Sequence, residues 1–247
     1  MLIPLLLIAG GIALQAQAAP EGVLPSVTVD FGRTPEGPAL STTLQFVLLL
    51  TVLTLAPTIL ITTTCFTRLA VVLHFLRQGM GTQQTPSNQV LLSLALALTF
   101  FVMAPVGREI YQDVIQPLDR NELTIEQAMD KTAAPLKVFM LKHTRTKDLA
   151  LFYSISKRPA PQTKADVTLD VLLPAFLISE LKTAFEIGFM IFLPFLIVDM
   201  VVASILLSMG MMMLPPVVIS MPFKVLLFVM VDGWHLIVGS LVKGYTG

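Results

Sequence analysis

The sequence predicts an all-α membrane protein made of kinked helical hairpins with a small helical insert between them. Hydrophobic residues make up 55% of the 247 residues and charged residues only 13%, about half the charged share of an average soluble domain. Nineteen of the charged residues fall between 108 and 170, so one polar segment separates two apolar halves. The hydrophobicity and a single cysteine, Cys65, exclude a disordered chain and a disulfide scaffold.

The formal net charge is zero, so the chain has no basic field that would attract nucleic acid, and none is expected as a partner. Residues 1–18 are predicted to be a cleaved signal peptide, because a short apolar run precedes small residues at Ala16 and Ala18. The run lacks a basic start, so an uncleaved interfacial or spanning helix is the alternative. Prolines and glycines then favour a flexible periplasmic lead over 19–43.

Two apolar segments predict a first membrane hairpin over 44–112. The expected helices cover 44–76 and 88–112, and each includes an uncharged run longer than the ~20 residues that cross a bilayer. Three basic residues without acidic neighbours are interpreted as a short connection on the cytoplasmic side: Arg68, His74 and Arg77.

A second hairpin is predicted over 171–247. Its helices are expected at 172–209 and 217–243, and the Pro215-Pro216 pair separates them because neither proline has a backbone N–H to continue a helix. Each of the four apolar segments also contains a proline that is expected to kink its helix and to need protein neighbours: Pro57, Pro105, Pro194 and Pro222.

The polar insert, 113–170, is predicted to be helical and periplasmic. Thr124 and Gln127 have capping-box spacing, Pro135 is expected to begin a new helix at 135–142, and a further helix is expected at 146–155. Its basic residues do not oppose an external location, because the positive-inside rule weakens for long loops.

Motifs for catalysis are scarce, so no enzyme activity and no cofactor are expected. The sequence has no HExxH, GxSxG or phosphate loop, and its three histidines are isolated, so no metal site is predicted. Ser179 and Lys182 match the SxxK pattern of penicillin-binding enzymes, but the SDN and KTG elements are absent.

Charges inside the last two apolar segments are the candidate structural charge pairs: Glu180, Lys182, Glu186, Asp199, Lys224 and Asp232. A charge left alone in hydrocarbon costs several kcal/mol, so these side chains are expected to face protein or water and to pair. Lys182 and Glu186 have i,i+4 spacing, and Lys224 could meet Glu180, Glu186 or Asp199.

Three interpretations of these charges are open. They could be clasps between subunits of an oligomer, which we favour, or a proton relay. They could also include an aspartyl pair, Asp199 and Asp232, as in intramembrane aspartyl proteases, although no GxGD motif accompanies them.

The candidate pore seal is a charge-free, methionine-rich turn before the proline pair: Met209, Met211, Met212 and Met213. Thioether side chains are flexible and polarizable, so a ring of such turns could close an orifice and still deform around varied objects. The alternative is a lipid-facing turn in which methionine only fills space.

The stretches 62–106 and 174–241 carry FTR, GTQQTPSNQV, SELK, IGF, MGMMMLPP and DGW, and with these motifs the chain resembles the FliP family from residue 44 to its end. Cys65 is a local departure from the usual TTSFTR. The resemblance implies a subunit of the type III secretion export gate in the flagellar basal body, and the leader favours a flagellum over an injectisome.

The same resemblance implies a homo-pentamer in a complex with FliQ and FliR, in contact with FlhB, in the bacterial inner membrane. It implies a helical funnel largely on the periplasmic side, with the methionine turn lining the closed pore. Two functions are left open. One is a passive pore for unfolded flagellar substrates, and the other is a proton-coupled transporter that uses an intramembrane carboxylate.

Overall fold

The computed structural model describes residues 42–246 apart from 83, 160, 164–165 and 212. The predicted signal peptide and nearly all of the predicted lead lie outside these residues. The chain divides into two compact units, Met1–Leu53 and Thr54–Gly247, and helix α1 crosses the boundary between them.

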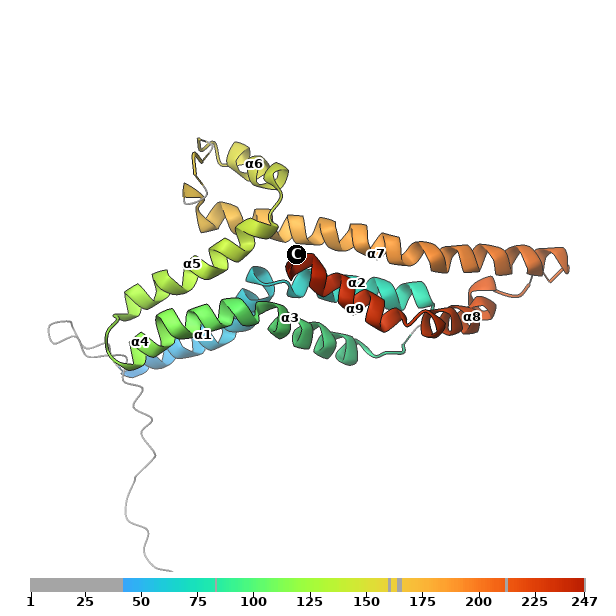
Figure 1. Cartoon of the computed structure of the whole chain (residues 1–247), viewed down its shortest axis with the longest axis horizontal. Coiled ribbons are helices and arrows are strands. Elements are labelled where there is room, and N and C mark those ends of the chain that lie inside the picture. The colour runs from blue at the N-terminus through green and yellow to red at the C-terminus, as the bar shows by residue number, and fades with distance from the viewer. Residues whose placement is uncertain (1–41, 83, 160, 164–165, 212, 247) are drawn as a thin grey trace, which may run out of the picture. The chain divides into compact units, whose positions relative to one another are not determined.

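Every regular element in the described residues is a helix, which confirms the all-α prediction (Figure 1). Two stretches are long and apolar enough to cross a membrane, Asn88–Asp119 and Leu169–Ser208, and there are up to four if each of two bent helix pairs counts as one span. The elements are α1 Thr42–Thr63, α2 Phe66–Met80, α3 Asn88–Ile110, the π-helix η1 Tyr111–Ile115, α4 Gln116–Asp119, α5 Ile125–His143, α6 Thr146–Ile155, α7 Leu169–Ser208, α8 Pro216–Met230 and α9 Gly233–Thr246.

The single helix expected at 44–76 is wrong, because the chain breaks between α1 and α2. Hydroxyl groups at the end of α1 bond to the preceding turn: Thr63 Oγ1 donates to the Ile59 carbonyl at 2.8 Å and Thr64 Oγ1 to the Leu60 carbonyl at 2.6 Å. The Thr64 hydroxyl also accepts from the backbone N–H of Phe66 at 3.3 Å. Such bonds compete with the helical ladder, so α2 starts afresh at Phe66.

The predicted cytoplasmic connection of basic residues is also wrong. Arg68, His74 and Arg77 all belong to α2, and Arg68 is buried. The actual connection to α3 starts at Gly81, whose φ of 71° is easiest for glycine, and ends at Ser87, whose hydroxyl accepts from the Val90 N–H. The positive-inside rule concerns exposed loop charge, so it does not apply to a buried arginine.

In the second apolar half, one helix matches the prediction and the other predicted helix is broken in two. Helix α7 runs unbroken over 40 residues and confirms the prediction for 172–209. The segment 217–243 instead forms α8 and α9, which are bent by 64° where Asp232 adopts a left-handed φ of 52°. The α-helices continue through all four predicted prolines, so the two breaks lie at other positions.

The insert differs from the prediction in one helix. The capping box of Thr124 and Gln127 is confirmed, and so is the helix at 146–155. Helix α5, however, runs through Pro135, which sits within it rather than starting a new helix. Pro135 is buried together with Phe139 and Met140, and this packing explains why the helix persists despite the missing N–H.

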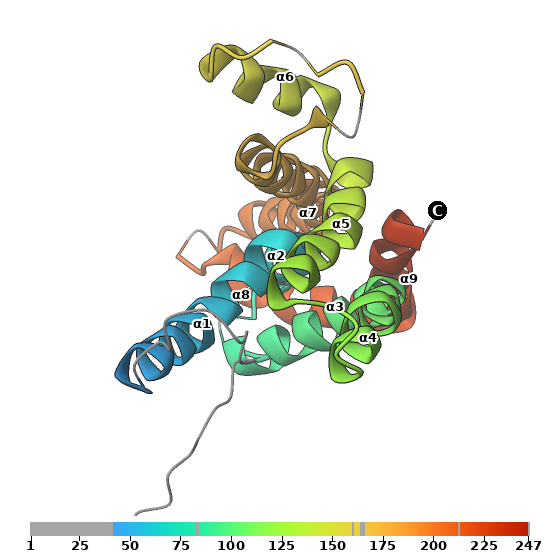
Figure 2. The ribbon, with the colours of Figure 1, turned by 90° about the vertical axis from the view of Figure 1, so that its left-hand side faces the viewer.

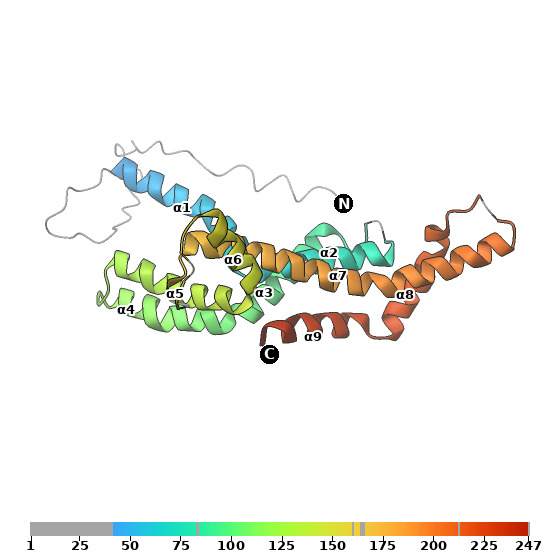
Figure 3. The same ribbon diagram turned by 90° about the horizontal axis from the view of Figure 1, so that it is seen from above.

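Helix α7 is the element on which the Thr54–Gly247 unit is assembled. Helices α2, α5, α6 and α8 all pack against it, and α3 packs on α2 (Figure 2). From the end of α7 the chain turns back through α8 and α9 (Figure 3). The α2–α7 contact is close because glycines face phenylalanines: a Cβ at Gly188 would lie 2.7 Å from the Phe75 ring, and one at Gly79 would lie 2.8 Å from the Phe195 ring.

A valine at Gly188 should therefore weaken the fold. Gly188→Val would force α2 and α7 apart, and we expect it to lower the free energy of unfolding by about 1–3 kcal/mol. Thermal unfolding of the detergent-purified protein measures this. Gly239→Ala is the matched control, because nothing lies within 4 Å of its added Cβ; equal loss in both variants would contradict close α2–α7 packing.

Candidate functional site

The first charged cluster is a buried ion pair that joins α2 to α7. Arg68 Nη2 donates to Glu180 Oε1 at 2.5 Å, and Arg68 Nε donates to Glu180 Oε2 at 2.9 Å. Glu180 is 0% exposed and Arg68 is 6% exposed. A bidentate arginine–carboxylate pair of this kind is strong and fixes geometry in addition to charge.

Helix α9 closes over this ion pair with Tyr245. The Tyr245 hydroxyl donates to Glu180 Oε2, and the Arg68 guanidinium lies 4.0 Å from the centre of the Tyr245 ring. The phenol thus satisfies a carboxylate oxygen while the ring face covers the cation. Helices α2, α7 and α9, which are far apart in sequence, thus meet at one buried ion pair.

The end of α5 completes the surroundings of Tyr245. The His143 ring meets the Tyr245 ring edge-on, with centroids 4.9 Å apart, and Phe139 stacks on Tyr245 at 6.0 Å. Burial, together with the nearby charges of Arg68 and Lys142, lowers the pKa of His143 from 6.5 to about 4. His143 is therefore neutral at neutral pH.

A second group of polar side chains ties the corner between α5 and α6 to α7. The Ser179 hydroxyl donates to Asp148 at 2.6 Å and accepts from the Arg145 N–H at 3.0 Å. Burial alone would raise the pKa of Asp148, but hydrogen bonds from Ser179 and Arg145 outweigh it and lower the pKa. Ser179, from the SxxK pattern, thus holds a helix in place, while the exposed Lys182 pairs with Glu186 at 3.9 Å.

The third cluster joins α7 to α8 near the turn that connects these two helices. Lys224 Nζ donates to Asp199 Oδ2 at 2.6 Å, and Ser220 Oγ donates to Asp199 Oδ1 at 2.5 Å. Ser220 and Lys224 are buried. We call Asp199, Ser220 and Lys224 the hairpin cluster.

Two of the predicted interior carboxylates, Glu180 and Asp199, meet buried cations. The sequence names Asp199 among the possible partners of Lys224, but it does not pair Glu180 with Arg68. Arg68 is the sole charge between residues 37 and 76, and that isolation was the available signal of a buried partner. Tyr245 and Ser220 were missed, since a single hydroxyl in an apolar helix gives no pattern.

Asp232 lies apart from the other candidates, in the exposed turn between α8 and α9. Asp199, by contrast, has both carboxylate oxygens engaged by α8 side chains. These different surroundings give no support to an aspartyl protease pair. Among the residues that the structure describes, no group of three His, Cys, Asp or Glu could hold a metal ion.

The methionine turn follows the end of α7. Met209 caps the helix, Gly210 adopts a φ of 73°, and the chain enters α8 at Pro216. The exposed fractions of Met209, Met211 and Met213 are 66%, 41% and 97%. Met212 lies outside the described residues. The turn therefore presents several thioethers away from its own chain.

Comparison with known proteins identifies the relatives of the chain. The model of the FliP family matches residues 49–241. The flagellar biosynthetic protein FliP of Bacillus subtilis (strain 168) is 58% identical over 205 residues, which cover 83% of this chain and 93% of that protein. The proteins of the same name from Aquifex aeolicus (strain VF5) and Rhizobium meliloti (strain 1021) are 51% and 46% identical, covering 82% and 95% of this chain and 85% and 96% of their own lengths.

Removing one partner of the buried ion pair should be costly. Glu180→Ala leaves the Arg68 guanidinium buried without compensation, and we expect the free energy of unfolding to fall by about 3–5 kcal/mol. Glu186→Ala, which breaks the solvent-accessible pairs with Lys182 and Arg145, should cost less than about 1 kcal/mol. Thermal unfolding in detergent compares the two. Arg68→Met combined with Glu180→Leu should recover part of the loss, and equal effects of the two single variants would refute the assignment.

Stability should also fall in mild acid because of His143. His143 takes up a proton near pH 6.5 in the unfolded chain but only near pH 4 in the folded chain. The free energy of unfolding should therefore decrease as the pH drops through this window. His143→Gln should remove this part of the decrease. Unfolding temperatures at about pH 7.5 and about pH 5 test the expectation, which fails if wild type and variant lose the same amount.

Proposed function

The chain belongs to the FliP family, and from this premise we propose that it is a pore-forming subunit of the flagellar export gate that passes unfolded substrates across the inner membrane. It is a membrane-embedded component of flagellar biosynthesis. The observation that carries the proposal is the turn at the end of α7, where exposed methionines project from an apolar hairpin.

The length of α7 supports a gate that extends beyond the bilayer. Forty residues of helix span about 60 Å at ~1.5 Å per residue, roughly twice the ~30 Å hydrocarbon thickness. Four of the five charged residues of α7 lie between Asp170 and Glu186. The more apolar second half therefore suits hydrocarbon, and the first half suits a polar environment. We place that first half, with the insert 113–170, on the periplasmic side.

Exposed aromatic side chains support assembly with other subunits. Phe185 and Phe189 are 54% and 59% exposed at the same level of α7 as the charged Lys182 and Glu186. Lipid cannot cover the aromatics there without also burying the charges, so protein is the better cover. We propose five copies in a complex with FliQ and FliR, in contact with FlhB, and the pore seal at Met209, Met211, Met212 and Met213.

A proton-coupled transporter has weaker support. A relay needs a carboxylate that exchanges its proton with water, whereas Glu180 is fully buried and Asp199 is held by two side chains of α8. These contacts lie within one chain, so they support structural roles for Glu180, Asp199 and Lys224 but not the clasps between subunits expected from the sequence. We propose no catalytic activity and no cofactor.

The methionine turn provides the test of the pore. A ring of flexible thioethers would exclude hydrated ions by dewetting and yield to a passing chain by rotamer changes alone. Replacing Met211, Met212 and Met213 with Gly should therefore raise ion leakage through the assembled gate. Conductance of bilayers that carry the purified complex measures this.

The matched control replaces Met200, which is 64% exposed on α7 away from the turn, with Ala. It should leave the resting barrier unchanged. Co-purification of the subunits checks assembly in each case. An assembled gate that keeps its ion barrier without the three methionines would show that they only pack at an interface.

A further inference from the structure

The α7–α8 hairpin is packed differently on the two sides of the hairpin cluster. On the side away from the turn, the arms are filled by aromatic side chains, with the rings of Phe195 and Phe228 6.4 Å apart and each 4–5% exposed. On the side toward the turn, Leu206 is the sole buried residue among those described from 200 to 219. Apart from Leu206, burial therefore ends at the cluster.

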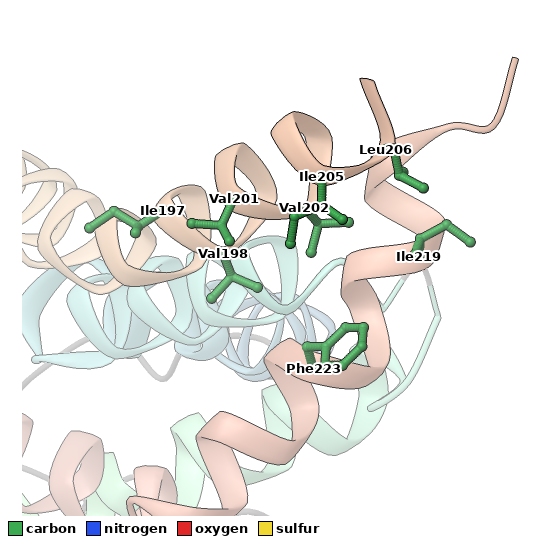
Figure 4. Close-up of a pocket in the computed structure, with 8 residues that line it drawn as sticks. All are labelled: Ile197, Val198, Val201, Val202, Ile205, Leu206, Ile219 and Phe223. Atoms are coloured by element: carbon green, nitrogen blue, oxygen red, sulfur yellow. The ribbon is translucent and has the colours of Figure 1, made fainter. Parts of the chain in front are cut away.

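The space between the arms changes at the same level. A groove of about 420 Å³ opens between the arms, beginning beside the cluster and continuing toward the turn. Its lining is apolar and consists of Ile197, Val198, Val201, Val202, Ile205 and Leu206 on α7 and Ile219 and Phe223 on α8 (Figure 4). The hydroxyls on this part of α7 do not cross the groove, since Ser204 and Ser208 donate to carbonyls of their own helix. Among the residues described from 200 to 219, no hydrogen bond or ion pair joins α7 to α8.

A proline interrupts the backbone ladder of α8 at the cluster. Pro222 lies between Ser220 and Lys224 and leaves the Val218 carbonyl, on the side toward the turn, without its helical donor. A proline inside a helix cannot donate to the carbonyl four residues earlier, which makes that turn easier to bend. The cluster and Pro222 thus bring together a fixed point and a soft point on α8.

We propose that the α7–α8 hairpin is a hinged arm, pinned by Asp199, Ser220 and Lys224, whose outer half bends to move the methionine turn. The role given to this movement rests on the proposed pore function, whereas the movement itself does not. Ser220 is a positioning residue in this hinge, because it holds the carboxylate oxygen of Asp199 that Lys224 does not bind. The hairpin cluster keeps the two arms in register while the outer half moves.

The mechanics can be measured without reference to export. Pairs of spin labels are placed across the arms on exposed residues in a Cys65→Ala background, one pair beyond the cluster at Ser204 and Val218, and one pair on its inner side at Leu196 and Leu226. The assembled complex is made with excess unlabelled chain, so that labelled copies are isolated. Distance distributions from pulsed electron resonance should be broad for the outer pair and narrow for the inner pair.

Loosening the pin should widen the inner distribution as well. Ser220→Ala should do so, whereas Ser208→Ala, which removes a hydroxyl bonded within its own helix, should not. Equal widths for the outer and inner pairs in the unmodified cluster would overturn the hinge and leave the pore proposal standing. An inner pair unaffected by Ser220→Ala would overturn the role of Ser220.

Locking the arms after assembly tests what the motion does. A bifunctional thiol reagent that bridges Ser204→Cys to Val218→Cys should abolish substrate export while the resting ion barrier stays intact. The same bridge between Leu196→Cys and Leu226→Cys should leave export unchanged, because the arms are already fixed there. Normal export through gates bridged at the outer pair would overturn the functional part of the inference, whatever the methionine replacement shows.

Discussion

The buried pair of Arg68 and Glu180 is the constraint around which the described helices are arranged. Either charge alone would be unstable in this interior, so α2 and α7 must present both groups at bidentate distance. That approach requires the two helices to be close, and the glycines at 79 and 188 permit it by accepting phenylalanine rings where a side chain would clash. Tyr245 then fixes α9, and its contact with His143 reaches α5.

Helix α7 carries two polar contacts that serve different purposes. Glu180 and Asp199 are 19 residues apart, or about 28 Å along the helix, close to one hydrocarbon thickness. The first holds together elements from most of the chain, and the second joins only the two arms of a hairpin. Polar contacts between helices are therefore concentrated at the end of α7 that bears the insert, and among the described residues they become fewer toward the methionine turn.

The fold class could be predicted because hydropathy and charge placement alone require apolar helices around a polar insert. The helix breaks could not, since Thr64 and Asp232 act through hydroxyl bonding and a left-handed residue inside otherwise unbroken apolar runs. For the site, composition singled out the methionine turn and the six interior charges. Partners such as Arg68 and Tyr245 depend on tertiary contacts more than 60 residues apart, which no local spacing encodes.

The chemistry of the outer hairpin suits an element with more than one stable position. Hydrogen bonds are directional, so an arm held by them would lose a defined free energy with any displacement. Apolar contacts change gradually, and methionine adapts to altered packing through three rotatable bonds. Beyond Asp199, the described hydroxyls of α7 are satisfied within their own helix, so bending the arms breaks no polar contact between them. The cost of movement is then limited to apolar area, which in the proposed gate a passing polypeptide would replace with its own side chains.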